Sequence, residues 1–274
     1  MARIAVGVEY DGADFYGWQV QKDGRSVQAC LEQAVSLVAD ESVRVHCAGR
    51  TDTGVHATAQ VAHFDTRAHR PEHNWILGIN SALPRDAAVT WALQVSGEFH
   101  ARFSAVERAY SYLILCDRAR TALYRERVCW RPGSLDGERM DRAAQALVGT
   151  HDFSAFRAAG CQAKSPIRTV HSLRVQQRGP WLRIDVRANA FLQHMVRNLA
   201  GVLMAVGAGE AELDWPAQVL ATRDRTRGGM TAPAAGLYLV DIHYPPPHRL
   251  PPGVPVRLGP WASGDSVGPH TKLV

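Results

Sequence analysis

The segment His46-Cys47-Ala48-Gly49-Arg50-Thr51-Asp52-Thr53-Gly54-Val55-His56-Ala57 decides how this chain is interpreted. An apolar strand predicted over residues 43–48 ends at Gly49, and a polar, basic stretch runs from there to Gly54. Glycines on both sides leave Arg50 and Asp52 on a flexible backbone. Taken alone, the segment fits a tight turn in which Asp52 hydrogen-bonds to its own backbone, which is the common use of such an aspartate. Whether Asp52 does chemistry therefore depends on the rest of the chain.

On both sides of this segment, the spacing of apolar residues predicts strands where they alternate and helices where they recur every three to four positions. Strands are predicted at 3–10, 43–48, 59–65, 89–95, 108–116, 168–176, 181–188 and 236–244. Helices are predicted from the cap Ser26 to Ala39, from Pro71 to Leu83, over 136–148, from the cap Asn189 to Gly207, and near 211–220. Strict alternation of strand and helix is absent. The pattern therefore favours an α+β fold with mixed, largely antiparallel sheets over a doubly wound one.

The length and net charge of the chain limit which kinds of partner it can have. The chain has 274 residues, enough for one large domain or two modest halves, and a formal net charge of +5. Of its 31 basic residues, 28 are arginines. Guanidinium groups suit phosphate oxygens, which favours a polyanionic partner, although a GC-rich coding bias gives the same composition. The arginines in 118–131 and 223–227 fit phosphate contacts or ordinary surface charge equally well.

Several classes of protein are disfavoured by what the sequence lacks. No apolar run approaches the roughly 18 residues of a membrane span, and residues 1–10 lack the apolar region of a signal peptide. The five cysteines are scattered, which is typical of reduced thiols, so we expect a cytoplasmic protein. No phosphate-binding loop occurs, and the twelve histidines lack paired metal-ligand spacing, so neither cofactor nor metal is expected.

One hydrolase-like motif lies near the end of the chain. Gly264-Asp265-Ser266-Val267-Gly268 matches the nucleophile elbow of α/β hydrolases, which needs a strand before it and a helix after it. Residues 245–274 are rich in proline and glycine and show no periodicity, so we expect a mobile tail. A chance match explains the motif better than a hydrolase site.

Many further segments resemble one family, the TruA family of tRNA pseudouridine synthases. The matching blocks follow one another in the family order across about residues 3–244, although Thr53 stands where the family usually has alanine. They are Tyr10-Asp11-Gly12, Gly17-Trp18-Gln19-x-Gln21, Ser26-Val27-Gln28, Gly49-Arg50-Thr51-Asp52-x-Gly54-Val55-His56-Ala57, Phe99-His100-Ala101-Arg102-Phe103-Ser104-Ala105, Arg108-x-Tyr110-x-Tyr112, Gly149-x-His151-Asp152-Phe153-x-x-Phe156, Ser165-x-x-Arg168-Thr169, Asn189-Ala190-Phe191-Leu192-x-His194-Met195-Val196-Arg197-Asn198 and Thr231-Ala232-Pro233-x-x-Gly236-Leu237.

The resemblance implies a pseudouridine synthase fold of the α+β class. Two related α/β halves would share a long mixed, mainly antiparallel sheet with a central cleft. We expect residues 1–104 and 105–244 to form the halves and 245–274 to form the tail. The resemblance also implies a homodimer that binds tRNA and isomerises uridine to pseudouridine at positions 38–40 of the anticodon stem-loop.

The residue chemistry agrees with that activity. Isomerisation moves the glycosidic link from N1 to C5 of uracil without oxidation or hydrolysis, so no cofactor is needed. Asp52 would be the nucleophile or base near the sugar, as carboxylates are at the anomeric carbon in glycosidases. By the resemblance, Arg197 is its ion-pair partner, and such a partner keeps a carboxylate ionised in a pocket.

Two other residues are expected to bind the substrate. A uridine inside a stem must leave its stack before reaction, and by the resemblance Tyr110 stacks on the flipped base. Arg50 would order the active loop or touch a phosphate. A non-catalytic RNA-binding module and a glycosylase that releases uracil are the alternatives. Analysis of nucleosides after incubation with unmodified tRNA separates all three.

Overall fold

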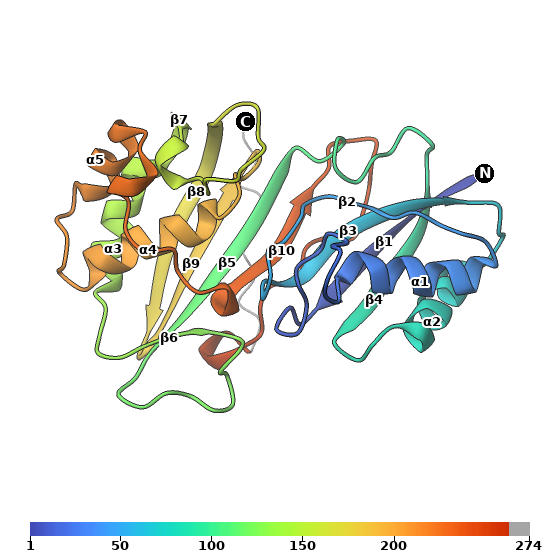
Figure 1. Ribbon diagram of the computed structural model, residues 1–274, viewed down its shortest axis with the longest axis horizontal. Helices are drawn as coiled ribbons and strands as arrows, with labels where there is room; N and C mark the ends of the chain where they lie inside the picture. The colour runs from blue at the N-terminus through green and yellow to red at the C-terminus, as the bar shows by residue number, and fades with distance from the viewer. Residues whose placement is uncertain (263–274) are drawn as a thin grey trace.

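The computed structural model describes residues 1–262, and within them the chain builds one ten-stranded sheet (Figure 1). The main path of the sheet runs β4-β1-β3-β10-β5-β9-β8-β7, while β2 pairs with β3 and β6 pairs with β5. The sheet is open and mixed, because β10 runs parallel to β3 and β6 runs parallel to β5, whereas the other pairs are antiparallel. The predicted α+β class is confirmed.

The strands are β1 (Ala2–Tyr10), β2 (His46–Cys47), β3 (His56–Thr66), β4 (Ala87–Val95), β5 (Glu107–Cys116), β6 (Cys129–Arg131), β7 (Gly149–Asp152), β8 (Ile167–Arg178), β9 (Trp181–Ala188) and β10 (Leu237–His243). The helices are α1 (Val27–Ala39), α2 (Glu72–Ala82), α3 (Gly137–Ala144), α4 (Met195–Gly207) and α5 (Trp215–Thr222), with short 3₁₀ turns at 145–147, 154–156, 225–227, 234–236 and 259–261. In Figure 1, α1 and α2 lie over one end of the sheet and α3 to α5 over the other.

Strand β10 joins the two ends of the sheet. It pairs antiparallel with β5, where Leu239 faces Tyr110, and parallel with β3, where Tyr238 faces His56. The strands β4-β1-β3 therefore meet β5-β9-β8-β7 through a strand from the end of the chain. The division into halves at residue 104 stays a prediction. It falls in the connection between β4 and β5.

The two faces of the sheet carry separate apolar cores. The larger core lies under the helices and includes Tyr110 and Tyr112 of β5. The smaller core, on the opposite face, takes Leu113 and Leu115 from the same strand. Alternate residues of a strand point to opposite faces, so β5 contributes to both cores and carries Tyr110 on the helical face.

The described part of the tail, residues 245–262, is not a loose end. Val256 and Trp261 are 4% and 1% exposed and belong to the smaller core. The Thr58 hydroxyl donates to the Val254 carbonyl, which ties the segment to β3. The expectation of a mobile tail is wrong for this stretch, because Val256 and Trp261 pack into the smaller core. The motif Gly264–Gly268 lies outside the described residues.

Several predicted elements differ in extent. The helix expected from Asn189 begins at Met195, because the Asn189 side chain accepts from the backbone nitrogens of Thr169 and Ala190 instead of capping a helix. His194 adopts a left-handed backbone (φ 61°), which ends any helix before it. The strand expected over 43–48 shortens to His46–Cys47, and the strands β6 and β7 were not predicted.

Residues 1–262 show neither a membrane-spanning helix nor a cluster of metal-binding side chains. No helix in this range has the length and apolar character to span a membrane. Within the same range, no cluster of three or more His, Cys, Asp or Glu side chains could hold a metal ion. All five cysteines are free thiols.

Candidate active site

The loop between β2 and β3 carries Asp52, and the segment after β1 fixes its first half. The Trp18 backbone nitrogen donates to the Thr51 carbonyl at 3.0 Å, and the Thr51 and Tyr10 hydroxyls lie 2.8 Å apart. Gly17 has a φ of +82°, and a Cβ on it would lie 2.6 Å from the Thr51 carbonyl oxygen. Only glycine allows this close approach. The sequence block around Gly17-Trp18 is therefore a clamp on the residue that precedes Asp52.

The second half of the loop is fixed in the same way. Gly54, with a φ of +76°, donates its backbone N–H to the Phe15 carbonyl at 3.3 Å. The backbone nitrogen of Val55 donates to the carbonyl of Asp52 at 3.1 Å, which closes a tight turn. Asp52 thus does sit on a turn, but its side chain is left out of that turn's backbone hydrogen bonds.

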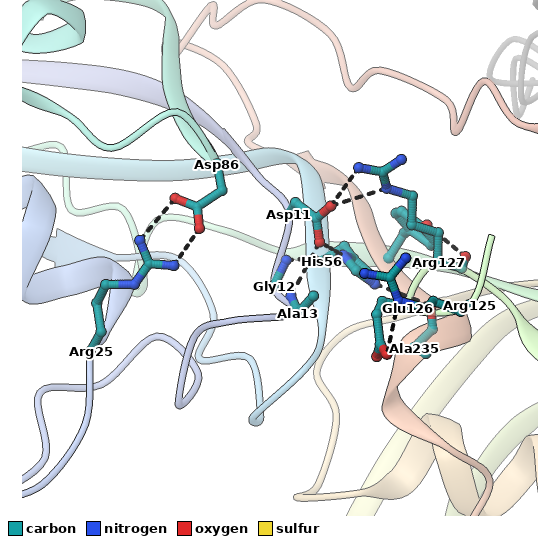
Figure 2. A network of polar contacts seen from close by, with 11 residues as sticks. Asp11, Gly12, Ala13, Arg25, His56, Asp86, Arg125, Glu126, Arg127 and Ala235 are labelled. Atoms are coloured by element: carbon teal, nitrogen blue, oxygen red, sulfur yellow. Dashed lines mark hydrogen bonds and ion pairs between the residues drawn. The ribbon is translucent and has the colours of Figure 1, made fainter. Parts of the chain in front are cut away.

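His56 connects this loop to the far part of the chain (Figure 2). Its ring is 2% exposed and stacks on Tyr238 of β10, with centroids 4.6 Å apart. Nδ1 lies 3.1 Å from the Asp11 carboxylate, and Nε2 lies 3.1 Å from the Ala235 carbonyl oxygen. His56 therefore joins the start of β3 to β10, four residues after Asp52.

Asp11 is the charged partner of this histidine. Arg127 pairs with the other carboxylate oxygen at 3.0 Å, as Figure 2 shows. Contact with the His56 ring, followed by hydrogen bonds from the Ala13 backbone nitrogen and from Arg127, holds the pKa of the Asp11 carboxyl well below its usual range despite the opposing effect of burial. Arg127 thus anchors the loop between β5 and β6 to the segment that clamps Asp52.

The Asp52 carboxylate faces the start of α4. Its Oδ2 lies 3.6 Å from Nε2 of His194, and its side chain is 30% exposed. Among residues 1–262, His194 is the one basic side chain within 4 Å of this carboxylate. The amino end of a helix carries partial positive charge, so α4 also favours an anion here. Asp52 is thus accessible, and its carboxylate faces a histidine and the amino end of a helix.

Tyr110, on β5, lies next to the loop that carries Asp52. Its side chain is 9% exposed, and its ring meets the edge of Phe191 with centroids 5.0 Å apart. A Cβ on Gly49 would lie 3.9 Å from the Tyr110 hydroxyl, so the ring borders the Asp52 loop. Burial, and after it the negative charge of Asp52, raise the pKa of Tyr110 far above its usual range. The phenol stays protonated beside the carboxylate.

Arg197 does not form the expected ion pair with Asp52 in this structure. Its Nε donates instead to the Ala232 carbonyl at 2.7 Å, and the Ala232 backbone nitrogen donates back to the Arg197 carbonyl at 3.1 Å. Arg225 orders the segment before Ala232 by donating to the Thr231 hydroxyl at 2.8 Å and to the Gly229 carbonyl at 3.0 Å. Arg225 is thus committed to internal contacts rather than free for phosphate.

Comparison with known proteins now decides the family. A family model described as tRNA pseudouridine synthase matches residues 6–104 and 143–245 of this chain. The chain belongs to the tRNA pseudouridine synthase family. The matched ranges contain Arg50, Asp52 and Arg197, whereas Tyr110 lies between them.

Curated relatives agree with this assignment. The chain is 56% identical to the tRNA pseudouridine synthase A of Alcanivorax borkumensis, over 92% of this chain and 94% of that one. It is 49% identical to that of Coxiella burnetii over 95% and 99%, and 53% identical to that of Pseudomonas aeruginosa over 92% and 88%. A chain of a solved Cbf5-Nop10-Gar1 complex aligns over 73% of this chain and 54% of that one, with a TM-score of 0.29 and 10% identity, too low to support any conclusion.

In this member of the pseudouridine synthase family, Arg108 links the loops around the site. It lies on β5 two residues before Tyr110 and has no carboxylate partner among residues 1–262. Its guanidinium donates to four carbonyls, those of Ala48 (3.2 Å), Arg102 (2.8 Å), Ala105 (3.0 Å) and Asn189 (3.0 Å). Burial lowers the pKa of Arg108. One cation thereby holds the start of the Asp52 loop and the start of the Phe191–His194 segment together.

Arg50 stands apart from these contacts. Its side chain is exposed and forms no hydrogen bond or ion pair with the described residues. It lies two residues before Asp52 on the fixed loop, so it is available to a substrate rather than committed to the fold.

The sequence prediction named Asp52, Tyr110, Arg197 and Arg50, and the structure brings Asp52 close enough to Tyr110 for its charge to act on the phenol. Their roles stay predictions. Sequence reasoning gave no role to His194, Phe191 or Arg108, although all three lie in matched blocks. The sequence did carry a signal for His194 and Phe191. They are polar and aromatic residues just before an apolar helix, and the start of a helix can bind an anion.

Proposed function

We propose that this member of the family isomerises uridine to pseudouridine at positions 38–40 of the tRNA anticodon stem-loop. Its relatives are named tRNA pseudouridine synthases, which are isomerases that act on tRNA. The observation that carries the proposal is the meeting of Asp52 and Tyr110. The Asp52 carboxylate, on the loop between β2 and β3, faces the start of α4 and is close enough to Tyr110 of β5 for its charge to act on the phenol.

The reaction needs little beyond these groups. The N1–C1′ bond of uridine breaks and a C5–C1′ bond forms, while the proton on C5 is lost and N1 gains one, so atoms and electrons balance within the base. In the proposal, Asp52 acts near the sugar as nucleophile or base. Tyr110 stacks on the uracil that has left the helix.

Arginines supply the charge complement of the substrate. Arg197 pairs with Asp52 once RNA is bound, by leaving the Ala232 carbonyl that now accepts its Nε. Arg50, exposed on the same loop as Asp52, contacts a phosphate near the target. We also propose that the chain acts as a homodimer, which sedimentation of the purified protein with and without tRNA tests.

Nucleoside analysis tests the proposed activity. Unmodified tRNA transcripts incubated with the protein should gain pseudouridine, and mapping should place it at positions 38–40. Asp52→Asn should abolish this gain while tRNA binding stays within a few fold, because asparagine keeps the shape but cannot act as nucleophile or base. Free uracil among the products would indicate a glycosylase, and unchanged nucleosides would indicate a binding module. Wild-type turnover by Asp52→Asn would remove Asp52 from the mechanism.

A further inference from the structure

Phe103 is the exception among the seven phenylalanines of the chain. Five of them are at most 1% exposed and Phe191 is half-buried, whereas Phe103 is 75% exposed. It lies in the connection between β4 and β5, beside Arg102, whose guanidinium carbon is 5.5 Å from the ring centroid. An aromatic ring left in water forgoes the free energy of burial. A partner that covers the ring recovers it.

The loop that presents Phe103 is held in place. The Nδ1 atom of His100 accepts from the backbone nitrogens of Arg102 (3.1 Å) and Phe103 (3.3 Å), and the His100 ring lies 4.3 Å from that of Phe103. The Ser104 hydroxyl accepts from the His100 backbone nitrogen at 3.0 Å. The ring is thus exposed on an ordered turn, so a ligand that covers it pays little additional ordering entropy.

Arg108 fixes this turn next to the Asp52 loop. A single Nη2 atom donates to the carbonyls of Arg102 and Ala48, and Ala48 lies four residues before Asp52. Arg50 and Arg102, both exposed, lie close enough to the half-buried Cys47 thiol to act on its charge. Arg108 therefore ties the turn that presents Phe103 to the start of the Asp52 loop, and the exposed Arg102 and Arg50 lie on these two linked segments.

We propose that Phe103 is a stacking platform for an unpaired base of the RNA substrate, with Arg102 and Arg50 contacting the phosphates on either side. Aromatic rings flanked by arginines bind single-stranded nucleic acid in this way, because every base has a π face and the backbone is anionic. This base is distinct from the uracil that Tyr110 receives. The identity of the RNA as tRNA rests on the proposed function, and the loop of the anticodon arm supplies unpaired bases near the target.

Binding measurements with four variants test the platform. Phe103→Ala should weaken tRNA binding by about fivefold to a hundredfold, the range that one base–aromatic stack is worth. Phe103→Trp should bind like the wild type, and Phe103→Leu should bind like the alanine variant, because leucine keeps apolar area but has no π face. Leu77→Ala, which alters a side chain 65% exposed on α2, is the matched control and should leave binding unchanged. Wild-type affinity in Phe103→Leu or Phe103→Ala would overturn the proposal.

Salt dependence separates stacking from charge. Phe103→Ala should leave the slope of log K against log salt unchanged, whereas Arg102→Gln should reduce it by about one. An unchanged slope for Arg102→Gln would remove that arginine from the platform.

Photocrosslinking identifies the occupant directly. The full chain with p-benzoylphenylalanine in place of Phe103 is irradiated with unmodified tRNA, and the expected adduct maps to a nucleotide of an unpaired loop. An adduct to a second copy of the chain, or no RNA adduct at all, would show a protein contact or an idle ring and overturn the proposal. The result does not depend on which uridine is isomerised. An RNA adduct with modification outside positions 38–40 therefore contradicts the proposed function and not the platform.

Discussion

His194 Nε2 lies 3.6 Å from Oδ2 of Asp52, and it is the nearest basic group to that carboxylate among residues 1–262. The left-handed backbone of His194 places the ring over the start of α4, while Arg197, one turn further along, is turned toward the Ala232 carbonyl. In this structure the histidine of this helix end faces the carboxylate, and the arginine does not pair with it. At 3.6 Å, the histidine is beyond ordinary hydrogen-bond distance.

The first prediction distinguishes the two basic groups. Arg197→Ala should lower the single-turnover rate by about tenfold to a hundredfold, the value of one hydrogen bond to a charged group, while His194→Gln should change it by less than about threefold. Single-turnover kinetics with saturating enzyme measures both. Arg197→Lys should recover part of the rate, because it keeps the charge without the fork of the guanidinium. The reverse ranking would assign the pairing role to His194.

Tyr110 gives a second prediction, about the ring rather than the hydroxyl. Tyr110→Phe should retain most tRNA binding, whereas Tyr110→Ala should weaken productive binding by about tenfold to a hundredfold. Equilibrium binding and single-turnover rates should be measured together. A phenylalanine variant as inactive as the alanine variant would point to the hydroxyl, which stays protonated in this site and could serve proton transfer at C5. Normal behaviour of Tyr110→Ala would make this tyrosine an ordinary core residue.

The basic loop after β5 supports a prediction that treats two neighbouring arginines differently. Arg125 has a side chain 71% exposed and only a 4.0 Å approach to Glu126, whereas Arg127 is paired with Asp11 at 3.0 Å. Arg125→Gln should reduce the slope of log K against log salt by about one, and Arg127→Gln should reduce it less but lower stability. Salt titration of tRNA binding and urea unfolding measure the two effects. A slope reduced by about one in each variant would place both arginines on phosphates.

Stability should depend on pH through His63. Burial, with the nearby positive charges of His100 and Arg3, lowers the pKa of His63 to about 4, from an ordinary value of 6.5. The unfolded chain therefore takes up a proton as pH falls below 6.5 while the folded chain does not, so stability falls between pH 6.5 and 4. The loss attributable to this residue is at most about 3 kcal/mol.

Urea unfolding at pH 7.5 and pH 5 measures this loss. His63→Asn, which can still accept the Ala101 backbone N–H that Nδ1 accepts at 3.2 Å, should lose less stability over this interval than the wild type. His69→Asn, at an exposed histidine, is the control and should keep the wild-type dependence. An identical dependence in His63→Asn would show that other groups carry it.

Local pattern predicted most of the fold. Ser26 caps α1 and accepts from the Ala29 backbone nitrogen, and the turn at Gly179-Pro180 joins β8 to β9, because in both cases the information lies within a few residues. The start of α4 was misplaced, since Asn189 finds its partner on Thr169, twenty residues away. The short strand β6 was not predicted for a similar reason. It exists only because β5 offers it an edge.

In the candidate site too, local motifs predicted some features, whereas others depend on contacts between distant residues. Asp52 and Tyr110 followed from the matched motifs, and their placement near one another came from the fold. The position of the Arg197 side chain could not be predicted, because it depends on a carbonyl 35 residues away that Arg225 helps to place. The burial of Trp261 depends on packing against a distant sheet face, so the sequence around Trp261 does not predict that burial.

The central place of β10 determines when the two groups of strands can join into one sheet during synthesis on the ribosome. The strand that lies in the middle of the sheet comes from residues 237–243, so β3 and β5 acquire the neighbour that joins them only after the other nine described strands have been made. Until then both strands present unpaired edges, which invite pairing with other nascent chains. A message truncated before codon 237 would leave the carboxylate and the tyrosine on two unconnected sheets. Synthesis of β10 is therefore the step that joins the two groups of strands into one sheet.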